Sequence, residues 1–533
     1  MTKAPQLPDD VNALKALLIE QNSHIEQIQT DKDKIQTDKE KLQRENTRLQ
    51  EQLNLAIARR YAASSEKISP DQFRLFGEAE VDDEIENDDA LSLLDEEDDS
   101  TSVAAYTRNK KTGRKPLPKS LVRVDEVHEL AEQDRICEHD GKILNEIGEV
   151  ISEQLDIIPA KIQVIRHIRK KYACGCGKCI KTAPMPNQPI PKSLAAPGLL
   201  AHITVSKYQD ALPLYRQEQI LQRIGVDIPR ATLANWMIQT GNLIQPVINL
   251  LRDRLLTYDI IHMDETTVQV LAEPNKKAQS KSYLWVQRGG PPDKPVILFD
   301  YDATRGQSVP LRLLEGFKGT IQTDGHAGYN AVVNQNNLVH LGCWAHARRK
   351  FSEAVKSQGK SKNKKSGKAQ RGLTFIQKLY KVEKTTLNFT IEDRSTARQQ
   401  QSLPVLDKLK NWLDESIITV PPKSAVGNAL HYLNNEWDKL VRYTHDGRYL
   451  MDNNLAENAI RPFVIGRKNW LFSQSIKGVK ASANLYSLIE TAKANGLEPY
   501  AYLRILFAKL PQATTVEEIE SLLPGNIDLE KFR

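Results

Sequence analysis

The stretch DIIHMDETTVQVL, at Asp259–Leu271, has the composition of a β-strand with an acid in its middle. Two more runs of β-branched and aromatic residues follow after short connections: SYLWVQRGG at Ser282–Gly290 and PVILFDYD at Pro295–Asp302. Such residues favour strands, and short Gly- and Pro-containing connections favour sequential strands that pair with each other. The three segments therefore predict a β-meander that carries Asp264 on its first strand.

Helical and extended segments alternate after the meander. A short helix is predicted at Ser308–Leu314, then a strand at Gly319–Gly325, a helical turn, and a strand at Asn337–Cys343 that runs on into the helical AHARRKF. A meander followed by helix–strand–helix–strand is the order of a ribonuclease H-like α/β fold. Asp324 falls at the carboxyl end of the fourth strand. In such a sheet the first and fourth strands are central neighbours, so we expect Asp264 and Asp324 to lie close together.

Carboxylates that meet in this way repel each other and raise the pKa of at least one, unless a cation joins them. Hard oxygen ligands suit Mg²⁺ or Mn²⁺, and a third carboxylate would complete a site for two ions about 4 Å apart. The candidate is Glu457, in LMDNNLAENAIRPFVIGRKNW at Leu450–Trp470. Asp300, Asp302 and Glu265 are competing acids that the spacing alone does not exclude.

Cations follow Glu457 along the same stretch: Arg461 one helical turn on, then Arg467 and Lys468. We expect these three to contact DNA phosphates. A salt bridge between Arg461 and Glu457 is the alternative. His326 is a further candidate for a contact with a phosphate group.

The CWAH sequence contains Cys343 and His346. A metal site needs more donors than one Cys and one His. We therefore expect the pair to pack beside the active site.

Composition and charge point to a nucleic-acid partner. The chain has 533 residues, enough for several domains, and a formal net charge of +6. Residues 78–100 hold thirteen acids and no Lys or Arg, so removing them from a total of +6 leaves +19 on the remainder. A basic body of that size suits a polyanion such as DNA. The acidic segment is too poor in apolar residues to fold alone, and it is predicted to be a disordered linker.

The sequence has no apolar run near the roughly 20 residues that span a bilayer, and its start lacks the apolar region of a signal peptide. We expect a cytoplasmic, nucleoid-associated protein with no membrane contact. Its five cysteines are too few for a secreted disulfide scaffold, and four of them cluster in one region.

The first 60 residues carry a heptad pattern. IQTDKDK and IQTDKEK are consecutive near-copies of one heptad, which predicts a coiled coil through which the chain forms a homo-oligomer. A lone solvated helix is the alternative. The residues spaced by seven or a multiple of seven are Leu14, Ile28, Ile35, Leu42 and Leu49, and the polar seam residues are Lys32, Lys39 and Asn46.

A basic arm and a cysteine-containing module follow the acidic linker. Arg114 and Lys115 lie in TRNKKTGRKPLPKS, an extended segment suited to DNA phosphates or a minor groove, with a solubilising linker as the alternative. Two Cys-bearing turns then flank a strand-rich stretch, as in a zinc ribbon, although such a ribbon can also fold without metal. The possible zinc ligands are Cys137, Asp140, Cys176 and Cys179, with His139 or Cys174 as alternatives.

A helix–turn–helix is predicted from Tyr215 onward, in YRQEQILQRIGVDIPRATLANWMIQTG. Gly225 supplies the turn, and Pro229 opens the second helix. The residues expected to face a DNA major groove are Arg230, Thr232, Asn235 and Gln239.

Together these patterns predict a multidomain α/β protein. Its segments are a coiled coil (1–60), an acidic linker (61–105), the basic arm with a zinc-ribbon-like module (106–190), the helix–turn–helix (191–254), a catalytic core (255–480) with a helical insertion at about 355–447, and a C-terminal helical element (481–533).

Several long motifs, in the same order along the chain, are similar to those of transposases of the insertion-sequence 66 family. The match runs from about residue 105 to about residue 510. The motifs are HMDET (262–266), IQTDGHAGY (321–329), HLGCWAHARRKF (340–351) and DNNLAENAIRPFVIGRKNWLFS (452–473), with GRKPLP, SEQLDIIPAKIQVIRHIRKKYAC and NLYSLIETAKANGLEPYAYL.

The resemblance implies a DDE-type transposase with a ribonuclease H-like core, an N-terminal coiled coil and a zinc-finger-like module. Carried over onto the matching residues, the catalytic acids are Asp264, Asp324 and Glu457. The family's first knuckle resembles Cys-Pro-x-Cys-Gly, whereas this chain has Cys-Glu-His-Asp-Gly at residues 137–141. The expected activity is metal-dependent hydrolysis and strand transfer on element ends and target DNA, with small accessory proteins as further candidate partners. A DNA-binding regulator or an inactive domesticated copy is the alternative.

Overall fold

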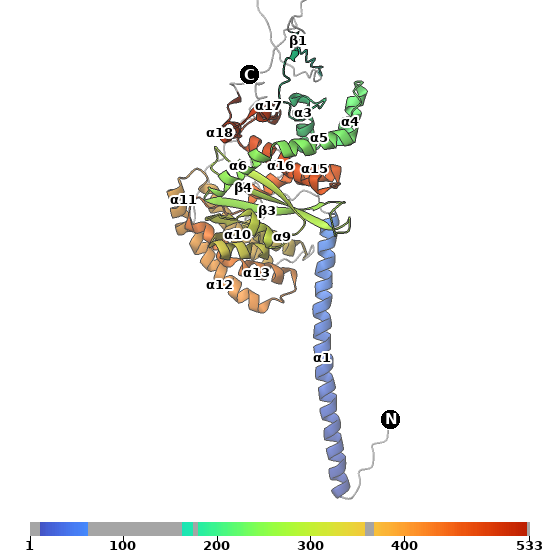
Figure 1. Ribbon diagram of the computed structural model, residues 1–533. Helices are drawn as coiled ribbons and strands as arrows, with labels where there is room; N and C mark the ends of the chain where they lie inside the picture. Colours follow the sequence, from blue (N-terminus) through green and yellow to red (C-terminus); the bar gives the residue numbers. More distant parts are fainter. Residues whose placement is uncertain (1–10, 62–161, 174–179, 358–366, 530–533) are drawn as a thin grey trace, which may run out of the picture. The chain divides into compact units, whose positions relative to one another are not determined.

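The computed structural model describes residues 11–61, 162–173, 180–357 and 367–529. The chain divides into two compact units, Met1–Gly77 with Ile168–Arg533, and Glu78–His167. Of the second unit, only residues 162–167 are described, so the fold presented here is that of the first (Figure 1). The acidic linker, Arg114 and Lys115 lie outside the described residues.

A mixed five-stranded sheet forms the centre, in the order β5-β4-β3-β6-β7. Strands β3, β4 and β5 are antiparallel neighbours, whereas β6 runs parallel to both β3 and β7. This confirms the predicted meander and the adjacency of its first strand to the fourth. The bounds are β3 Ile260–Gln269, β4 Lys281–Gly289, β5 Val296–Asp302, β6 Thr320–Gln322 and β7 Val339–Leu341, so the last two strands are shorter than predicted.

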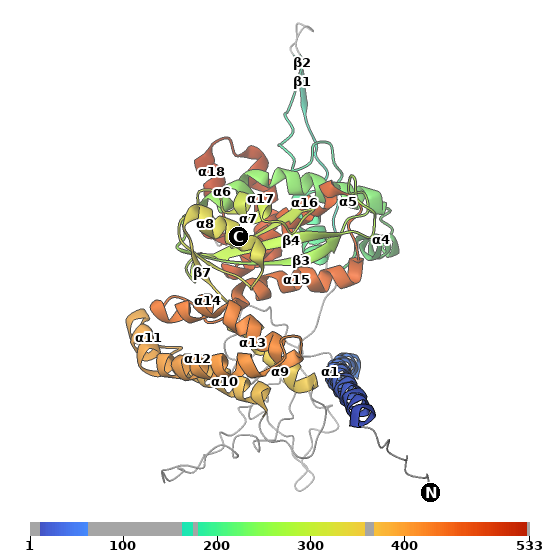
Figure 2. The ribbon, with the colours of Figure 1, turned by 90° about the horizontal axis from the view of Figure 1, so that it is seen from below.

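Strand alternation assigns the side chains to the two faces of the sheet. Asp264 pairs across with Val286, which pairs with Phe299, and these three share the face covered by α15 (Asn454–Trp470) and α16 (Ile476–Ala494) (Figure 2). The opposite face is covered by η2 (Ala327–Tyr329) and α7 (Ser308–Leu313), followed by α8 (Asn330–Asn336); there the rings of Trp285 and Tyr329 lie 5.9 Å apart. Glu265, next to Asp264, belongs to this second face.

The sheet shares a single hydrophobic core with helices that precede it in the chain and with helices that follow it. Trp285, Phe463 and Tyr486 are fully buried in it, and burial of each such side chain contributes about 1.5–3 kcal/mol. Other helices that contribute include α3 Pro197–Tyr208, α5 Arg230–Leu243, α6 Gln245–Leu256 and α17 Pro499–Lys509. The short η5 Leu510–Gln512 and α18 Val516–Glu520 follow α17.

Helices α4 (Leu214–Arg223) and α5 form the predicted helical hairpin. Gly225 makes the turn with φ +82°, a conformation that a residue with a Cβ rarely adopts. Pro229 precedes the first residue of α5, and Trp236 is buried. Among the expected groove-facing residues, Arg230 and Asn235 are exposed, while Thr232 and Gln239 are half-buried.

Between β7 and α15 the chain forms the predicted, mainly helical insertion. Its helices have a hydrophobic core of their own, which includes Trp344, Phe351 and Trp412. The helices are α9 Trp344–Ser357, α10 Lys368–Thr385, α11 Ile391–Ala397, α12 Leu403–Thr419, α13 Ala425–Asn435 and α14 Trp437–Val441, with a π-helical turn η3 at Arg398–Ser402 and a 3₁₀ turn η4 at Arg442–His445.

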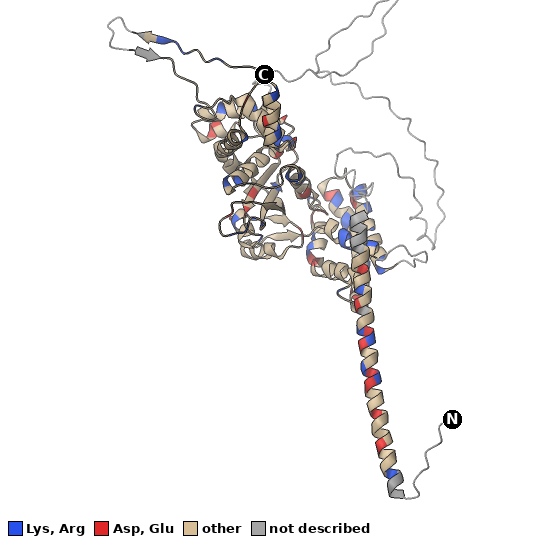
Figure 3. Cartoon of the chain, turned by 90° about the vertical axis from the view of Figure 1, so that its right-hand side faces the viewer, with Lys and Arg blue, Asp and Glu red and all other residues tan. Residues whose placement is uncertain are grey.

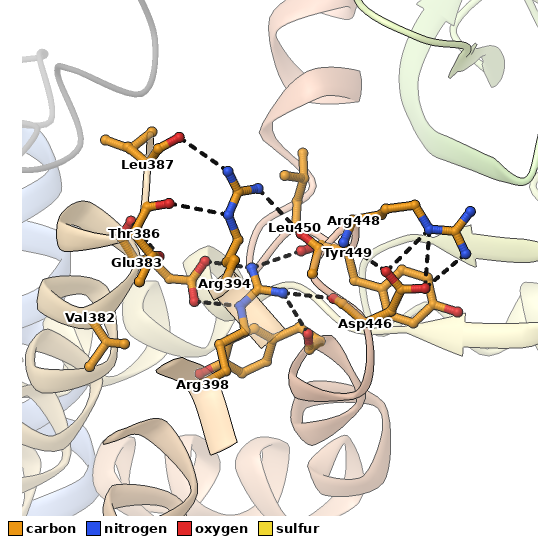
Figure 4. A network of polar contacts seen from close by, with 12 residues as sticks. Val382, Glu383, Thr386, Leu387, Arg394, Arg398, Asp446, Arg448, Tyr449 and Leu450 are labelled. Carbon is orange, nitrogen blue, oxygen red and sulfur yellow. Dashed lines mark hydrogen bonds and ion pairs between the residues drawn. The ribbon is translucent and has the colours of Figure 1, made fainter. Parts of the chain in front are cut away.

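A buried arginine fixes the last part of the insertion (Figure 4). Arg398 is fully buried and forms an ion pair with Glu383 at 2.6 Å. Its guanidinium also donates to the carbonyl oxygens of Tyr443, Asp446 and Tyr449 at 2.8–2.9 Å. These bonds satisfy a charge that would otherwise be costly to bury. They hold the segment that leads into α15.

The predicted N-terminal helix is present as α1 (Val11–Tyr61). Residues of the heptad seam, such as Ile35 and Leu42, are exposed, and residues of both charges alternate along the helix (Figure 3). Pairing of α1 with a second copy stays a prediction. Its last turns contact the insertion: the Asn54 side chain donates to the Ser357 carbonyl oxygen at 3.1 Å.

Strands β1 (Lys171–Ala173) and β2 (Ile180–Thr182) form an antiparallel hairpin. The candidate zinc ligands, at positions 137, 139, 140, 174, 176 and 179, all lie outside the described residues. None of the helices in the described part of the chain has the length and apolar character needed to cross a membrane.

Candidate active site

The N-terminus of α15 is fixed to β3 beside Asp264. Asn453, which precedes α15, donates from its side chain to the Met263 carbonyl oxygen at 2.7 Å. Its side-chain oxygen lies 3.3 Å from Nδ1 of His262, and its own carbonyl oxygen accepts the N–H of Glu457 at 3.2 Å. Asp264 lies two residues from His262 and so points to the same face. Glu457 is thereby brought to the sheet face that carries Asp264.

The other two predicted acids act on Asp264 through their charge. Burial raises the pKa of Asp264 well above its usual range, and the charges of Glu265, Glu457 and Asp324 raise it further. The backbone N–H of Glu265 donates a hydrogen bond to Asp264 Oδ1, which acts in the opposite direction and lowers the pKa. Ionised Asp264 therefore needs a positive partner.

Asp324 lies two residues beyond the end of β6, in a loop that holds its carboxylate. Oδ1 accepts the N–H of His326 at 2.9 Å, and Oδ2 lies 3.5 Å from Nη2 of Arg305. The His326 ring is itself fixed, with Nε2 3.1 Å from the Arg305 carbonyl oxygen. In this arrangement His326 orients Asp324, and its contact with a phosphate stays a prediction.

Glu265 competes with Asp264 in the sequence but has different surroundings. Its side chain is 1% exposed. It accepts from Arg305 Nε at 2.6 Å and from the Tyr329 hydroxyl at 2.6 Å. Glu265 thus fixes Arg305, which in turn lies beside Asp324.

The other two competitors, Asp300 and Asp302, lie on strand β5, two strands from β3. Arg312 pairs with them at 2.8 Å and 3.2 Å, respectively, and Arg252 pairs with Asp300 at 3.0 Å. These contacts give both acids a structural role at the edge of the sheet.

The start of α9 contributes a second group of side chains at Glu457. The ligand atoms of Cys343, His346 and Glu457 all lie within 4.8 Å of one another. His346 Nδ1 is 3.5 Å from Glu457 Oε1, Arg349 Nη2 is 3.9 Å from Oε2, and the Asn453 N–H donates to Cys343 Sγ at 3.3 Å. Burial lowers the pKa of His346 and favours the neutral ring. Cys343 and His346 thus pack beside the acids as expected, with a donor set of sulfur, nitrogen and oxygen that suits Zn²⁺ better than Mg²⁺.

Sequence reasoning missed two arginines at this site, Arg305 and Arg349. Arg305 comes from a loop after β5, where the sequence carries no periodic signal. Arg349 lies in AHARRKF, a basic run in which the sequence does not distinguish one cation from its neighbours.

The chain has been compared with known proteins. The model of the transposase IS66 family matches residues 192–481, which is more than half of the chain. This protein belongs to the transposase IS66 family. Three further family models match other parts of the chain. They are "Transposase C of IS166 homeodomain" at residues 48–125, the zinc-finger binding domain of transposase IS66 at 134–177, and the IS66 C-terminal element at 487–524.

Among curated proteins, the chain is similar to the uncharacterized proteins y4jD and y4qI of Sinorhizobium fredii (strain NBRC 101917 / NGR234). Each is 33% identical over 425 residues, covering 77% and 78% of this chain and 81% and 77% of the relative, respectively. The uncharacterized protein y4hP of the same strain is 28% identical over 439 residues, or 80% of this chain and 78% of the relative. No solved structure matches.

In this IS66 family member, the three cations after Glu457 differ in their surroundings. Arg461 and Lys468 are exposed. Arg467 instead donates to the carbonyl oxygen of Thr267 and lies 3.2 Å from the Thr266 hydroxyl, so it holds α15 on β3. A contact of any of the three with DNA stays a prediction.

Proposed function

We propose that this member of the IS66 family cuts and joins DNA by metal-dependent phosphoryl transfer on a ribonuclease H-like core. Asp264, Asp324 and Glu457 are the catalytic acids in this proposal. Three observations support it: β6 lies beside β3, Asn453 holds the start of α15 on β3, and the charges of Glu457 and Asp324 raise the pKa of the buried Asp264. A strand order with two parallel strands beside an antiparallel meander supports the same core.

The carboxylate oxygens of these three acids fit divalent metal ions. Carboxylate oxygens are the ligands that Mg²⁺ and Mn²⁺ prefer, and a buried, crowded carboxylate such as Asp264 is stabilised in its ionised form by a cation. Bound Mg²⁺ or Mn²⁺ would supply the chemistry that activates a nucleophilic oxygen and stabilises the leaving oxygen. Asp264, Asp324 and Glu457 would hold two such ions. Arg305 and Arg349 orient the carboxylates of Asp324 and Glu457.

The reaction proceeds in two steps that use the same acids. Water attacks the phosphodiester at an element end and releases a 3′-hydroxyl group. That hydroxyl then attacks a phosphodiester of the target DNA, so that one bond forms as another breaks. No covalent protein–DNA intermediate is required, because the site aligns the nucleophile with the leaving group.

The other segments recognise and pair the DNA ends. Arg230, Thr232 and Asn235 of α5 contact the major groove, and the basic arm with Arg114 and Lys115 contacts phosphates. The zinc-finger match at residues 134–177 supports a structural Zn²⁺ in the module before the core. Helix α1 pairs two subunits, so that two ends are processed together.

A strand-nicking assay tests the proposal. The substrate is a duplex that contains the end of the insertion sequence encoding this chain, with its flanking DNA, in Mg²⁺. We expect Asp264→Asn and Glu457→Gln to lose at least about 100-fold in rate, as removal of one transition-state contact does. Asp302→Asn, a change in an acid that pairs with Arg312 on β5, is the matched control and stays near the wild-type rate.

Equal rates for all four proteins would reject the three acids. Binding without cleavage in Mg²⁺ or Mn²⁺ would instead identify a DNA-binding regulator. A pre-cut end tests the second step: a product joined to target DNA supports a transposase, and its absence together with normal nicking identifies a nuclease.

A further inference from the structure

Helix α15 presents an exposed face that begins at Glu457. Arg461, Ile465 and Lys468 follow Glu457 by four, eight and eleven residues, which places the four side chains within an arc of about 80°. Ile465 is 51% exposed, and Arg461 and Lys468 are exposed as well. The opposite face of the helix, with Phe463, is buried. The exposed face therefore combines cations with an apolar side chain on the helix that carries a catalytic acid.

A strained turn lies at the end of this face. Leu471 has φ +64° and ψ −51°, and the Phe472 N–H donates to the Trp470 carbonyl oxygen at 2.8 Å. This is a γ-turn of the rare, strained kind, in a conformation that a leucine seldom adopts. The turn directs two large apolar side chains outward: Leu471 is 65% exposed and Phe472 is 43% exposed.

The surrounding structure holds the turn on both sides. Before it, Arg467 is bonded to Thr266 and Thr267 of β3. After it, the Ser473 N–H donates to the Gln269 carbonyl oxygen at 2.9 Å, and the Ser473 carbonyl oxygen accepts the Leu271 N–H at 3.0 Å. A strained backbone persists only where its surroundings determine it in this way, and such residues gather at binding sites and active sites.

The end of α15 also adjoins the helical hairpin. The side chain of Asn469 donates to the carbonyl oxygen of Ala211 at 2.9 Å, in the loop before α4. The exposed face of α15 thus runs from Glu457 to the helices that we propose bind DNA. A DNA duplex that contacts both Glu457 and the helical hairpin therefore passes along the exposed face of α15.

We propose that Leu471 and Phe472 form a wedge that enters a base step of the element-end duplex while Arg461 and Lys468 contact its phosphates. Apolar wedges flanked by cations unstack and kink DNA in this way. The charge of the two cations favours a duplex over a second protein surface as the occupant. This inference rests on the proposed function.

The spacing along α15 sets the position of the wedge. Leu471 follows Glu457 by 14 residues, or about 21 Å at the helical rise of about 1.5 Å per residue. At about 3.4 Å per base pair, this corresponds to about six base pairs. A duplex that runs along α15 with its scissile phosphate at Glu457 meets the wedge about six base pairs away.

Fluorescence of 2-aminopurine, which rises when the base is unstacked, tests the wedge. The fluorescent base is placed at each position within ten base pairs of the cleavage point in the element-end duplex. The full-length Asp264→Asn variant is used without divalent metal, so that the signal does not depend on chemistry. We expect a rise at one step, about six base pairs from the cleavage point.

In the same background, Leu471→Ala with Phe472→Ala removes the signal and raises Kd by about 5- to 150-fold, the range for loss of one base–aromatic stacking contact. Phe472→Trp, which keeps a stacking ring, retains the signal. The control is Ile418→Ala, at a residue of α12 that is 85% exposed; it changes neither quantity. Circular dichroism of each variant verifies the fold, because these side chains add little to the core.

The outcomes separate the wedge from the proposed function. A protein that nicks and joins DNA but gives no fluorescence rise, or an unchanged rise in the double variant, overturns the wedge alone. A rise that the double variant removes, in a protein without nicking activity, supports the wedge and rejects the transposase chemistry. A change in oligomeric state of the double variant, with DNA binding intact, assigns the turn to a second copy and overturns the wedge.

Discussion

Asp452 provides a test of the electrostatics around the candidate site. Its buried carboxylate joins three elements: Oδ1 accepts the Tyr380 hydroxyl at 2.7 Å and the Ala345 N–H at 2.8 Å, while Oδ2 accepts from the Asn454 side chain at 3.0 Å. Despite these bonds, burial raises the pKa of Asp452 from 3.8 to about 6. Replacing Asp452 by Asn removes the titration and keeps an oxygen acceptor.

The sign of the effect follows from proton binding. Between pH 3.8 and about 6 the folded protein holds the Asp452 proton more tightly than the unfolded chain, so the free energy of unfolding falls as pH rises through this window. The pKa difference corresponds to about 3 kcal/mol, at 1.36 kcal/mol per pH unit. At pH 4 the unfolded chain is already partly ionised, so wild type should lose about 2 kcal/mol of this relative to Asp452→Asn between pH 4 and pH 7.

Urea unfolding at intervals of half a pH unit measures this difference. Tryptophan fluorescence reports both hydrophobic cores, because Trp285 lies in the core of the sheet and Trp344 and Trp412 lie in the core of the insertion. Taking the difference between the two proteins at each pH cancels the titration of all other groups that they share. A difference that stays constant from pH 4 to pH 7, or wild type gaining stability with pH, would refute the reasoning.

Three further predictions concern residues around the site. Arg398→Met should lower the free energy of unfolding by about 3–5 kcal/mol, because it leaves the partly buried Glu383 carboxylate and three backbone carbonyl oxygens without their partner; an unchanged urea midpoint would contradict this. Lys468→Gln should weaken DNA binding and reduce its salt slope by about 1, whereas Arg467→Gln should lower the melting temperature by releasing Thr267; the reverse pattern would assign Arg467 to DNA. Mg²⁺ should raise the melting temperature of wild type but not of Asp264→Asn, and chelation should undo the shift; equal shifts would place the ion elsewhere.

The sequence was sufficient for the strands and their order. The β-branched runs and short connections at residues 259–302 predict the meander, and the structure has it. The helical hairpin followed equally well from Gly225 and Pro229, because these residues restrict the backbone locally. What the sequence could not set was the length of β6 and β7, since strands of three residues end where tertiary contacts end.

The site was harder to derive, because its details depend on contacts between distant segments. Adjacent acids such as Asp264 and Glu265 point to opposite faces, and the sequence does not say which face α15 covers. Likewise, the sequence suggests that Arg467 is available to contact DNA, whereas in the structure it bonds to Thr266 of β3. Arg305 comes from a loop whose path no local pattern determines.

The separation of Asp324 and Glu457 along the chain has a consequence for synthesis. They are 133 residues apart (457 minus 324), and the intervening insertion folds around a core of its own. A growing polypeptide therefore exposes its first two acids long before the third leaves the ribosome. Under the proposed function, a truncated product that ends before Glu457 lacks one of the three acids, so we expect it to have no nicking activity.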